Sequence, residues 1–345
     1  MTHHAPLSMT ATCPEDLLAM VPVTLGFAPE ESVVMLTFGG RAFQARVDLP
    51  LCLDEVPDVV TSLVGPARRH RVERVVFVLY TDDEVLAGRL ARGLRDRCRG
   101  EGIAVLETLR AHDGRWFPLL HGDRVVREVG VPYDVSAHPF LVDAVLRGRV
   151  TLRSRTELEA TLRSDPVRVA AVAAALAEGP RGRRGRRGRP TGEWDRDHPP
   201  PTPVLLVEGR WVQDTVRRHV ADGSRPTDGE AARLLRAVLL LRLRDAAWQL
   251  IRRAEARAHV ELWADLVRRC PQELLAGPAA LLGWAAWQAG DGALAWCALD
   301  RVHEVEPRYG LASHLAMLLE HAVPPEEWEA DADWAEGLRA SDGSA

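Results

Sequence analysis

The chain of 345 residues contains no lysine, so all 44 of its basic residues are arginine. We interpret this absence as codon bias rather than as a use of guanidinium chemistry. Six of the arginines lie within residues 181–189, and the rest of the chain is therefore more acidic than the net charge of −5 indicates. Acidic folded parts argue against broad binding of nucleic acids or anionic membranes by the domains themselves.

Cysteine is also scarce, and its five positions are scattered without the spacing of a metal knuckle. This pattern favours reduced thiols in a cytoplasm. No apolar run approaches the roughly 20 residues that span a bilayer. The first ten residues also lack the basic and apolar regions of a signal peptide. We therefore expect a cytoplasmic protein that does not bind a membrane.

Motifs of the large enzyme classes are missing as well. The sequence has no phosphate-binding G-x-x-x-x-G-K-[ST], no G-x-S-x-G elbow, no H-E-x-x-H pair and no G-x-G-x-x-G between a strand and a helix. No pattern of this kind indicates a cofactor or a metal. We therefore favour a protein without catalytic activity, although one group of acidic residues keeps an enzyme open as an alternative.

Two apolar segments organise the first part of the chain. Val33–Leu36 follows an apolar helix and a Gly-Phe turn, and Val75–Tyr80 is a second run without a polar side chain until its last residue. Strands that are apolar on both faces belong in the middle of a sheet covered on two sides. With their neighbours they predict the order β-β-α-β-α-β-β followed by helices, in which Val125–Val126 forms a short edge strand. We expect an α/β domain with a mixed sheet at residues 1–178.

The composition changes at residues 179–203, which are rich in arginine, glycine and proline and have little to bury. We expect a flexible linker there. Arg/Gly tracts can bind RNA or phosphates, so weak nucleic-acid binding by residues 181–189 remains an alternative. Residues 204–335 have helical periodicity and hold eight of the ten tryptophans. They predict an all-α domain of helical-repeat type with its own core, followed by a disordered tail at 336–345. Thr227 with Glu230 predicts a capping box at the start of a helix over 230–241.

A helical hairpin is the clearest motif of this second domain. In Ala276–Pro307 two helical stretches meet at Gly290-Asp291-Gly292, and a proline closes the second stretch. The segment resembles one tetratricopeptide-type hairpin, a repeat with a period of 34 residues. Small residues at Gly283 and Ala295 allow the two helices to approach closely. The positions that match the repeat are Leu282, Gly283, Gly290, Asp291, Ala295 and Pro307.

The same resemblance supplies candidate partner-binding residues. The groove-lining positions of such a hairpin fall on Trp284, Trp287 and Gln288, while Arg308 and Tyr309 lie just past the closing proline. Aromatic residues and arginine are typical anchors of an interface. The alternative is that the tryptophans pack against the flanking helices, because aromatic stripes at helical spacing are usually core.

Acidic residues at strand ends are the candidates for catalysis. Asp82 and Asp83 follow the apolar strand Val75–Tyr80, and ligands of open α/β sheets bind at the carboxyl ends of strands. Asp48 and His121 are candidates to join them around a hard divalent cation. The alternative is that these acids cap the next helix, where its dipole favours negative charge. We expect the polar rim at residues 30–32 to lie at the opposite edge of the sheet.

Several blocks of sequence occur in a specific order over nearly the full length: DLLAMVPVTLGFAPEESVVML, ARVDLP, GVPYD, SRTELEATL, RLRDAAWQL and a last block that begins LLGWAAWQAGDG. In these blocks the chain resembles the domain-of-unknown-function family 4192 of high-GC Gram-positive bacteria. The resemblance implies a shared fold and lineage, and no established activity.

These observations lead to one preferred hypothesis and two alternatives. The preferred one is a non-enzymatic interaction or regulatory module that binds a protein or peptide through the helical domain. One alternative is a metal-assisted hydrolase or a small-ligand-binding α/β domain that uses Asp82 and Asp83. The other is a weak nucleic-acid binder that uses the arginine-rich linker.

Overall fold

The computed structural model describes residues 9–39, 43–148, 150–178, 200–328, 333–336 and 338. The chain divides into two compact units, of which the first ends at Leu158 and the second begins at Glu159. The first holds a mixed sheet and the second is helical, so the predicted fold class is confirmed. Nearly all of the predicted linker, with its arginine tract, and most of the predicted disordered tail lie outside the described residues.

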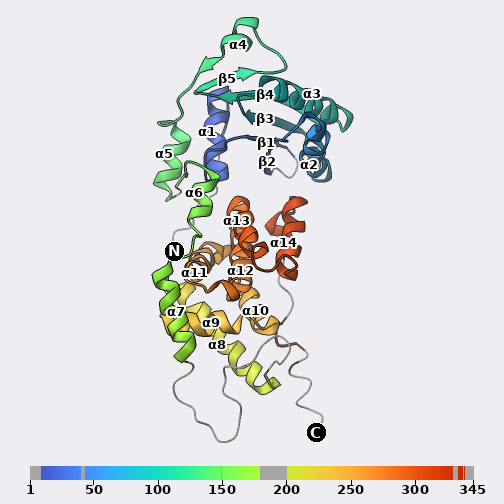
Figure 1. The fold of residues 1–345 in the computed structure, drawn as a ribbon. Helices are drawn as coiled ribbons and strands as arrows, with labels where there is room; N and C mark the ends of the chain where they lie inside the picture. The colour runs from blue at the N-terminus through green and yellow to red at the C-terminus, as the bar shows by residue number, and fades with distance from the viewer. Residues whose placement is uncertain are drawn as a thin grey trace, which may run out of the picture. The chain divides into compact units, whose positions relative to one another are not determined.

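The sheet of the first unit has the strand order β2-β1-β3-β4-β5-β6 (Figure 1). Its neighbours are antiparallel except for β3 and β4, which run parallel and are joined through a helix. The strands are β1 Ser32–Phe38, β2 Gln44–Asp48, β3 Arg74–Tyr80, β4 Ala104–His112, β5 Arg115–Pro118 and β6 Val131–Pro132.

The apolar central strands are covered on both faces, as their sequence predicts. Val34 and Leu36 of β1 pack in one cluster with helix α1 (Pro14–Leu25). Val33 and Met35 point the other way and pack with α2 (Val56–Arg69) and α3 (Glu84–Gly100). Figure 1 shows α1 on one side of the sheet and α2 with α3 on the other. The alternation of side chains along a strand explains both cores.

The expected edge strand at Val125–Val126 is wrong, because this segment forms helix α4 (Arg124–Val129). The Asp123 carboxylate accepts a hydrogen bond from the Val125 main-chain N–H (2.7 Å) and caps the helix. Arg124 pairs with Glu128 one turn later (2.8 Å). These local polar contacts override the β preference of two adjacent valines, and β6 forms the sheet edge instead.

The boundary between the units differs from the expected one at residue 178. After α5 (Pro139–Leu146) and α6 (Arg155–Ala160), helix α7 (Pro166–Glu178) packs within the second unit against α9 (Asp228–Ala237). The main-chain N–H of Asp165 also donates to the Arg268 carbonyl at the end of α11 (2.7 Å). Helix α7 is therefore part of the helical unit.

The remaining helices of this unit follow in short steps. Helix α9 begins with the predicted capping box, in which Thr227 and Glu230 satisfy each other's main-chain N–H groups. No helix among the described residues is both long enough and apolar enough to cross a membrane. The other helices are α8 Thr202–Asp222, α10 Leu241–Trp248, α11 Ala256–Arg268, α12 Ala276–Gln288, α13 Gly292–His303 and α14 Gly310–Glu320.

Helices α12 and α13 form the predicted hairpin around Gly290, whose φ of +79° is one that glycine adopts at little cost. The Asp291 carboxylate caps α13 by accepting from the Leu294 N–H (2.9 Å). Gly283 lies where α12 packs closely against its neighbours. A Cβ there would lie 3.1 Å from the Leu315 side chain and 3.4 Å from the Ala295 carbonyl oxygen. The assignment to the tetratricopeptide type stays a prediction.

Replacing Gly283 by leucine should therefore lower the unfolding free energy by about 1–3 kcal/mol through overpacking. The matched control is Gly229→Leu in the same unit, where a Cβ has no neighbour within 4 Å. It should change stability by no more than about 0.5 kcal/mol. Urea unfolding followed by tryptophan fluorescence reports on this tryptophan-rich unit. Equal effects of the two changes would contradict the close packing at Gly283.

Candidate functional site

The end of the sheet brings several of the predicted acidic positions together. Asp48 of β2 and Tyr80 of β3 both lie opposite Ser32 of β1, so Asp48 and the residues after β3 share one edge. The hydroxyl of Thr81 donates to a carboxylate oxygen of Glu31 (3.3 Å). The expectation that residues 30–32 lie at the opposite edge is therefore wrong, because β1 runs antiparallel to β3.

Two of the four candidate catalytic residues form contacts within or next to their own element. Asp83 caps helix α3 by accepting from the Leu86 N–H (2.8 Å). Asp48 pairs with Arg46 of its own strand (2.7 Å). Asp82 is exposed and follows β3. The Asp83 contact is the one that the helix-capping alternative predicts.

His121 lies away from this edge. Its Nε2 is 3.5 Å from a carboxylate oxygen of Glu107. Glu107 pairs with Val76 near the start of β3, whereas Tyr80 at the end of β3 pairs with Ala111. Four residues of strand separate the two positions, or roughly 13 Å. No group of three or more histidine, cysteine, aspartate or glutamate side chains in the described ranges is placed to hold a metal ion.

Arg110 of β4 is the residue at this edge that the sequence pattern did not reveal. It is 3% exposed, its guanidinium donates to Glu84 (2.7 Å), and it lies 4.1 Å from the centre of the Phe117 ring. It also donates to the main-chain carbonyls of Thr81 and Asp82 at 3.5 and 3.4 Å. Arg110 thus fixes the loop that carries the acidic residues, and its strand, which also holds Glu107 and His112, gives no local signal for this role.

The helical unit places the predicted partner-binding tryptophans in a cluster of aromatic rings that we call the aromatic box: Trp248, Trp284, Trp287, His314 and Trp328. Trp284 is fully buried at its centre. Its ring centre lies 5.0 Å from Trp248, 5.1 Å from Trp287, 5.0 Å from Trp328 and 6.1 Å from His314. Edge-to-face contacts of this kind add to the burial of the rings.

The other three predicted residues are distributed differently. Gln288 and Tyr309 are buried, and Tyr309 lies 5.5 Å from the guanidinium of Arg244. Arg308 is exposed. Of the five residues, only Arg308 is therefore open to a partner in this conformation, and the tryptophans contact a segment of the chain itself.

That segment comprises the described residues of 323–336, which we call the tail segment. Its Val323 carbonyl accepts a hydrogen bond from the indole N–H of Trp287 (3.2 Å). Trp328 completes the aromatic box, with its ring 5.7 Å from Trp248. Glu326 forms an ion pair with Arg253. The groove expected to receive a partner is thus occupied by the chain's own C-terminal part.

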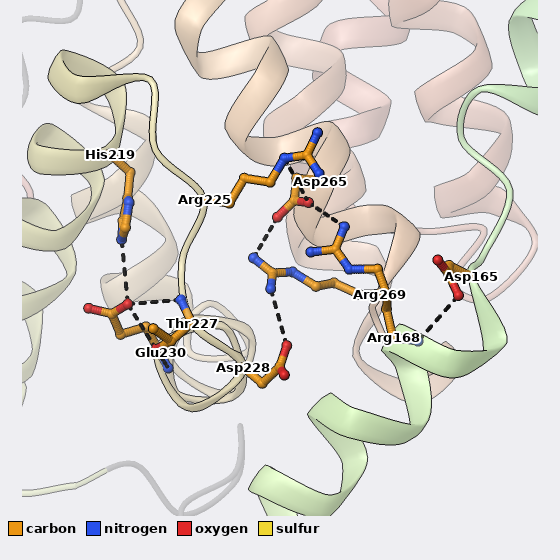
Figure 2. Close-up of polar contacts among 9 residues, drawn as sticks. All are labelled: Asp165, Arg168, His219, Arg225, Thr227, Asp228, Glu230, Asp265 and Arg269. Atoms are coloured by element: carbon orange, nitrogen blue, oxygen red, sulfur yellow. Dashed lines mark hydrogen bonds and ion pairs between the residues drawn. The ribbon is translucent and has the colours of Figure 1, made fainter.

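A second polar cluster lies in the same unit and has no counterpart in the sequence motifs (Figure 2). Asp265 of α11 is buried and contacts Arg168 of α7 (2.8 Å), Arg269 (2.5 Å) and Arg225 (3.8 Å). The buried Arg269 also pairs with Asp228 at the start of α9 (3.3 Å). One carboxylate therefore joins three segments that are far apart in the sequence.

The neighbouring histidine and capping box form a separate group, drawn on the other side of Figure 2. Burial, followed by the charge of Arg218, lowers the pKa of His219, whose Nδ1 lies 2.8 Å from the Ser224 hydroxyl. Burial raises the pKa of Glu230, but hydrogen bonds from Thr227 and Arg218 outweigh it and lower the pKa to about 2. Glu230 is therefore ionised at neutral pH.

Fold and sites define a protein with a mixed α/β unit and a helical unit whose tryptophans pack against its own tail segment. A family model described as "Domain of unknown function (DUF4192)" matches residues 14–326, and the chain belongs to this family. No curated protein and no solved structure matches the chain. The resemblance to this family in the sequence is confirmed, and the description of the family names no activity.

Replacing Asp265 by asparagine should lower the unfolding free energy by about 3–5 kcal/mol, because it leaves buried Arg269 and Arg168 without their carboxylate. The control is Asp214→Asn, which removes the exposed pair with Arg217 and should cost no more than about 1 kcal/mol. Urea unfolding at pH 7.5 measures both. Similar values for the two variants would contradict the role of Asp265.

Acid should destabilise the helical unit through His259. Burial lowers the pKa of His259 to about 4, partly offset by a hydrogen bond to the main chain of Leu250. An unfolded chain takes up this proton near pH 6.5, so stability falls as the pH drops from about 6.5 toward 4, by about 2 kcal/mol at pH 5. His259→Gln should remove this part of the pH dependence between pH 7.5 and 5. An unchanged slope in urea unfolding would show that His259 is not its source.

Proposed function

We propose that the protein is a non-enzymatic interaction module whose helical unit binds a segment of a protein or peptide. The observation that carries the proposal is the hydrogen bond from the Trp287 indole N–H to the main-chain carbonyl of Val323. A donor aimed at a main-chain carbonyl recognises the backbone of a segment, whatever its side chains. The helical unit already makes this contact with its own tail segment.

The conformation and composition of the tail segment support the same function. Pro324 has φ −71° and ψ 141°, and Pro325–Glu327 after it form a single 3₁₀ turn. Two adjacent prolines restrict the backbone before binding, which lowers the entropy that such a segment loses when it docks. In the aromatic box, Trp328 supplies a large apolar anchor of the kind that dominates binding energies. The site thus combines one hydrogen bond to the backbone with ring contacts to one side chain.

A labelled synthetic peptide with the sequence of residues 323–338 provides a probe for this groove. We expect it to bind the full chain that carries Trp328→Ala, since that change removes the anchor of the resident segment. Adding Trp287→Phe should weaken binding about five- to tenfold, because one hydrogen bond contributes about 1 kcal/mol. Fluorescence anisotropy measures the dissociation constants, and circular dichroism checks the fold.

The matched control is Trp263→Phe, which makes the same chemical change at another fully buried tryptophan of the unit. The indole N–H of Trp263 has no hydrogen-bond partner among the described residues, so this variant should bind the probe as tightly as its parent. A probe that itself carries Trp328→Ala should not bind. Absence of binding of the unaltered probe to the folded Trp328→Ala chain would overturn the proposed function.

A further inference from the structure

We infer that the natural ligand of the aromatic box is an acidic segment of another protein that presents a tryptophan, and that the tail segment competes with it in cis. This inference rests on the proposed function, since it names the ligand class and the regulation of the same groove. Three features of the helical unit carry it: a second attachment point of the tail, an unsatisfied donor in the box, and the charge of the tail.

The tail is attached a second time at a socket on helix α8. Trp334 is buried, and its ring lies against Gly209, where a Cβ would be only 2.0 Å from the ring. The main-chain N–H of Trp334 also donates to the side-chain oxygen of Gln249 (3.4 Å). Gly209 belongs to α8, whereas the Val323 carbonyl and the Trp328 ring are contacted by residues of α10 and α12. The socket therefore holds the tail in place without being part of the groove that it fills.

The tail leaves one hydrogen bond of the aromatic box unmade. The indole N–H of Trp248 is buried and has no acceptor among the described residues, although the Trp248 ring packs against both Trp284 and Trp328. A buried donor without a partner is costly. A ligand that brings a carbonyl or carboxylate oxygen to this N–H gains a bond that the resident segment does not make. A segment that supplies this acceptor should therefore bind the aromatic box more tightly than the tail does.

The charge of the tail specifies the ligand class further. Residues 326–336 contain six acidic residues, and both Trp328 and Trp334 directly follow an acid. Glu326 pairs with Arg253, which is exposed on the helical unit beside the equally exposed Arg252. Opposite charges on the groove rim and on the segment fix the direction in which the segment lies. An external segment that replaces the tail needs the same acidic character.

Competition in cis has a measurable consequence. A tethered segment competes at an effective concentration in the millimolar range, so the wild-type chain should bind the peptide probe of residues 323–338 only weakly. Gly209→Ala fills the socket and forces Trp334 out without altering the box. We expect this variant to bind the probe about tenfold or more tightly than wild type. Gly229→Ala, where a Cβ meets no atom within 4 Å, should bind it like wild type.

Trp334→Ala serves as the second opening variant, because it empties the socket and leaves α8 unchanged. Equal probe affinity of wild type, Gly209→Ala and Trp334→Ala, in a series in which the Trp328→Ala chain binds, would overturn competition by the tail and leave the proposed function standing. Failure of every chain to bind would overturn the proposed function itself. The two failures are therefore distinguishable.

The acidic character is tested on the probe and on the groove separately. A peptide in which Glu326 and Glu327 are changed to glutamine should bind the Trp328→Ala chain several-fold more weakly, and the difference should shrink as salt is raised. Arg253→Gln in the protein should weaken binding of the unaltered peptide. It should have little further effect on binding of the glutamine peptide. Equal binding of the two peptides at low salt would overturn the acidic ligand class.

Discussion

The helical unit depends on the burial of helix α12, since every one of its 13 residues is buried. A helix that is apolar all round has no face for water and must be surrounded. Helices α10, α11 and α13 contact it, and Leu315 of α14 closes over Gly283. The tail segment covers the remaining tryptophans, Trp284 and Trp287. The tail is therefore both a part of the fold and the occupant of the groove.

The elements that cover α12 differ in how many contacts hold them in place. The helices are joined to it by continuous apolar packing, and α7 and α9 are tied to α11 through the buried carboxylate of Asp265. The tail has one hydrogen bond to Trp287, the Trp328 ring in the aromatic box, Trp334 in the socket on α8, and an exposed ion pair between Arg253 and Glu326 of a kind that contributes little. Exchange of the tail for another segment is the least costly way to change the surface of this unit.

The sequence predicted what local patterns determine, and missed what depends on distant partners. Apolar runs identified β1 and β3, and a capping box identified the start of α9. The direction of β1 relative to β3 has no local signal, so the edge on which Glu31 lies was assigned wrongly. Arg110 and Asp265 resemble surface residues in the sequence, and only the fold shows that each is buried among partners from other elements. The alternative that the acids cap the next helix agrees with the contact of Asp83, whereas the ion pair of Asp48 with Arg46 was not predicted.

Other unpartnered polar atoms in the described residues help to locate the groove as the place where a ligand gains most. The Trp263 indole N–H and the Ser32 hydroxyl are also buried without an acceptor or donor. Both lie within cores formed by helices or strands, so no ligand reaches them unless the fold opens. Trp248 differs because its neighbour Trp328 belongs to the tail, the one cover of α12 that is held by a few contacts. A ligand that replaces the tail can accept a hydrogen bond from Trp248 that the tail does not accept, which favours the exchange. For this reason we assign the binding function to the aromatic box.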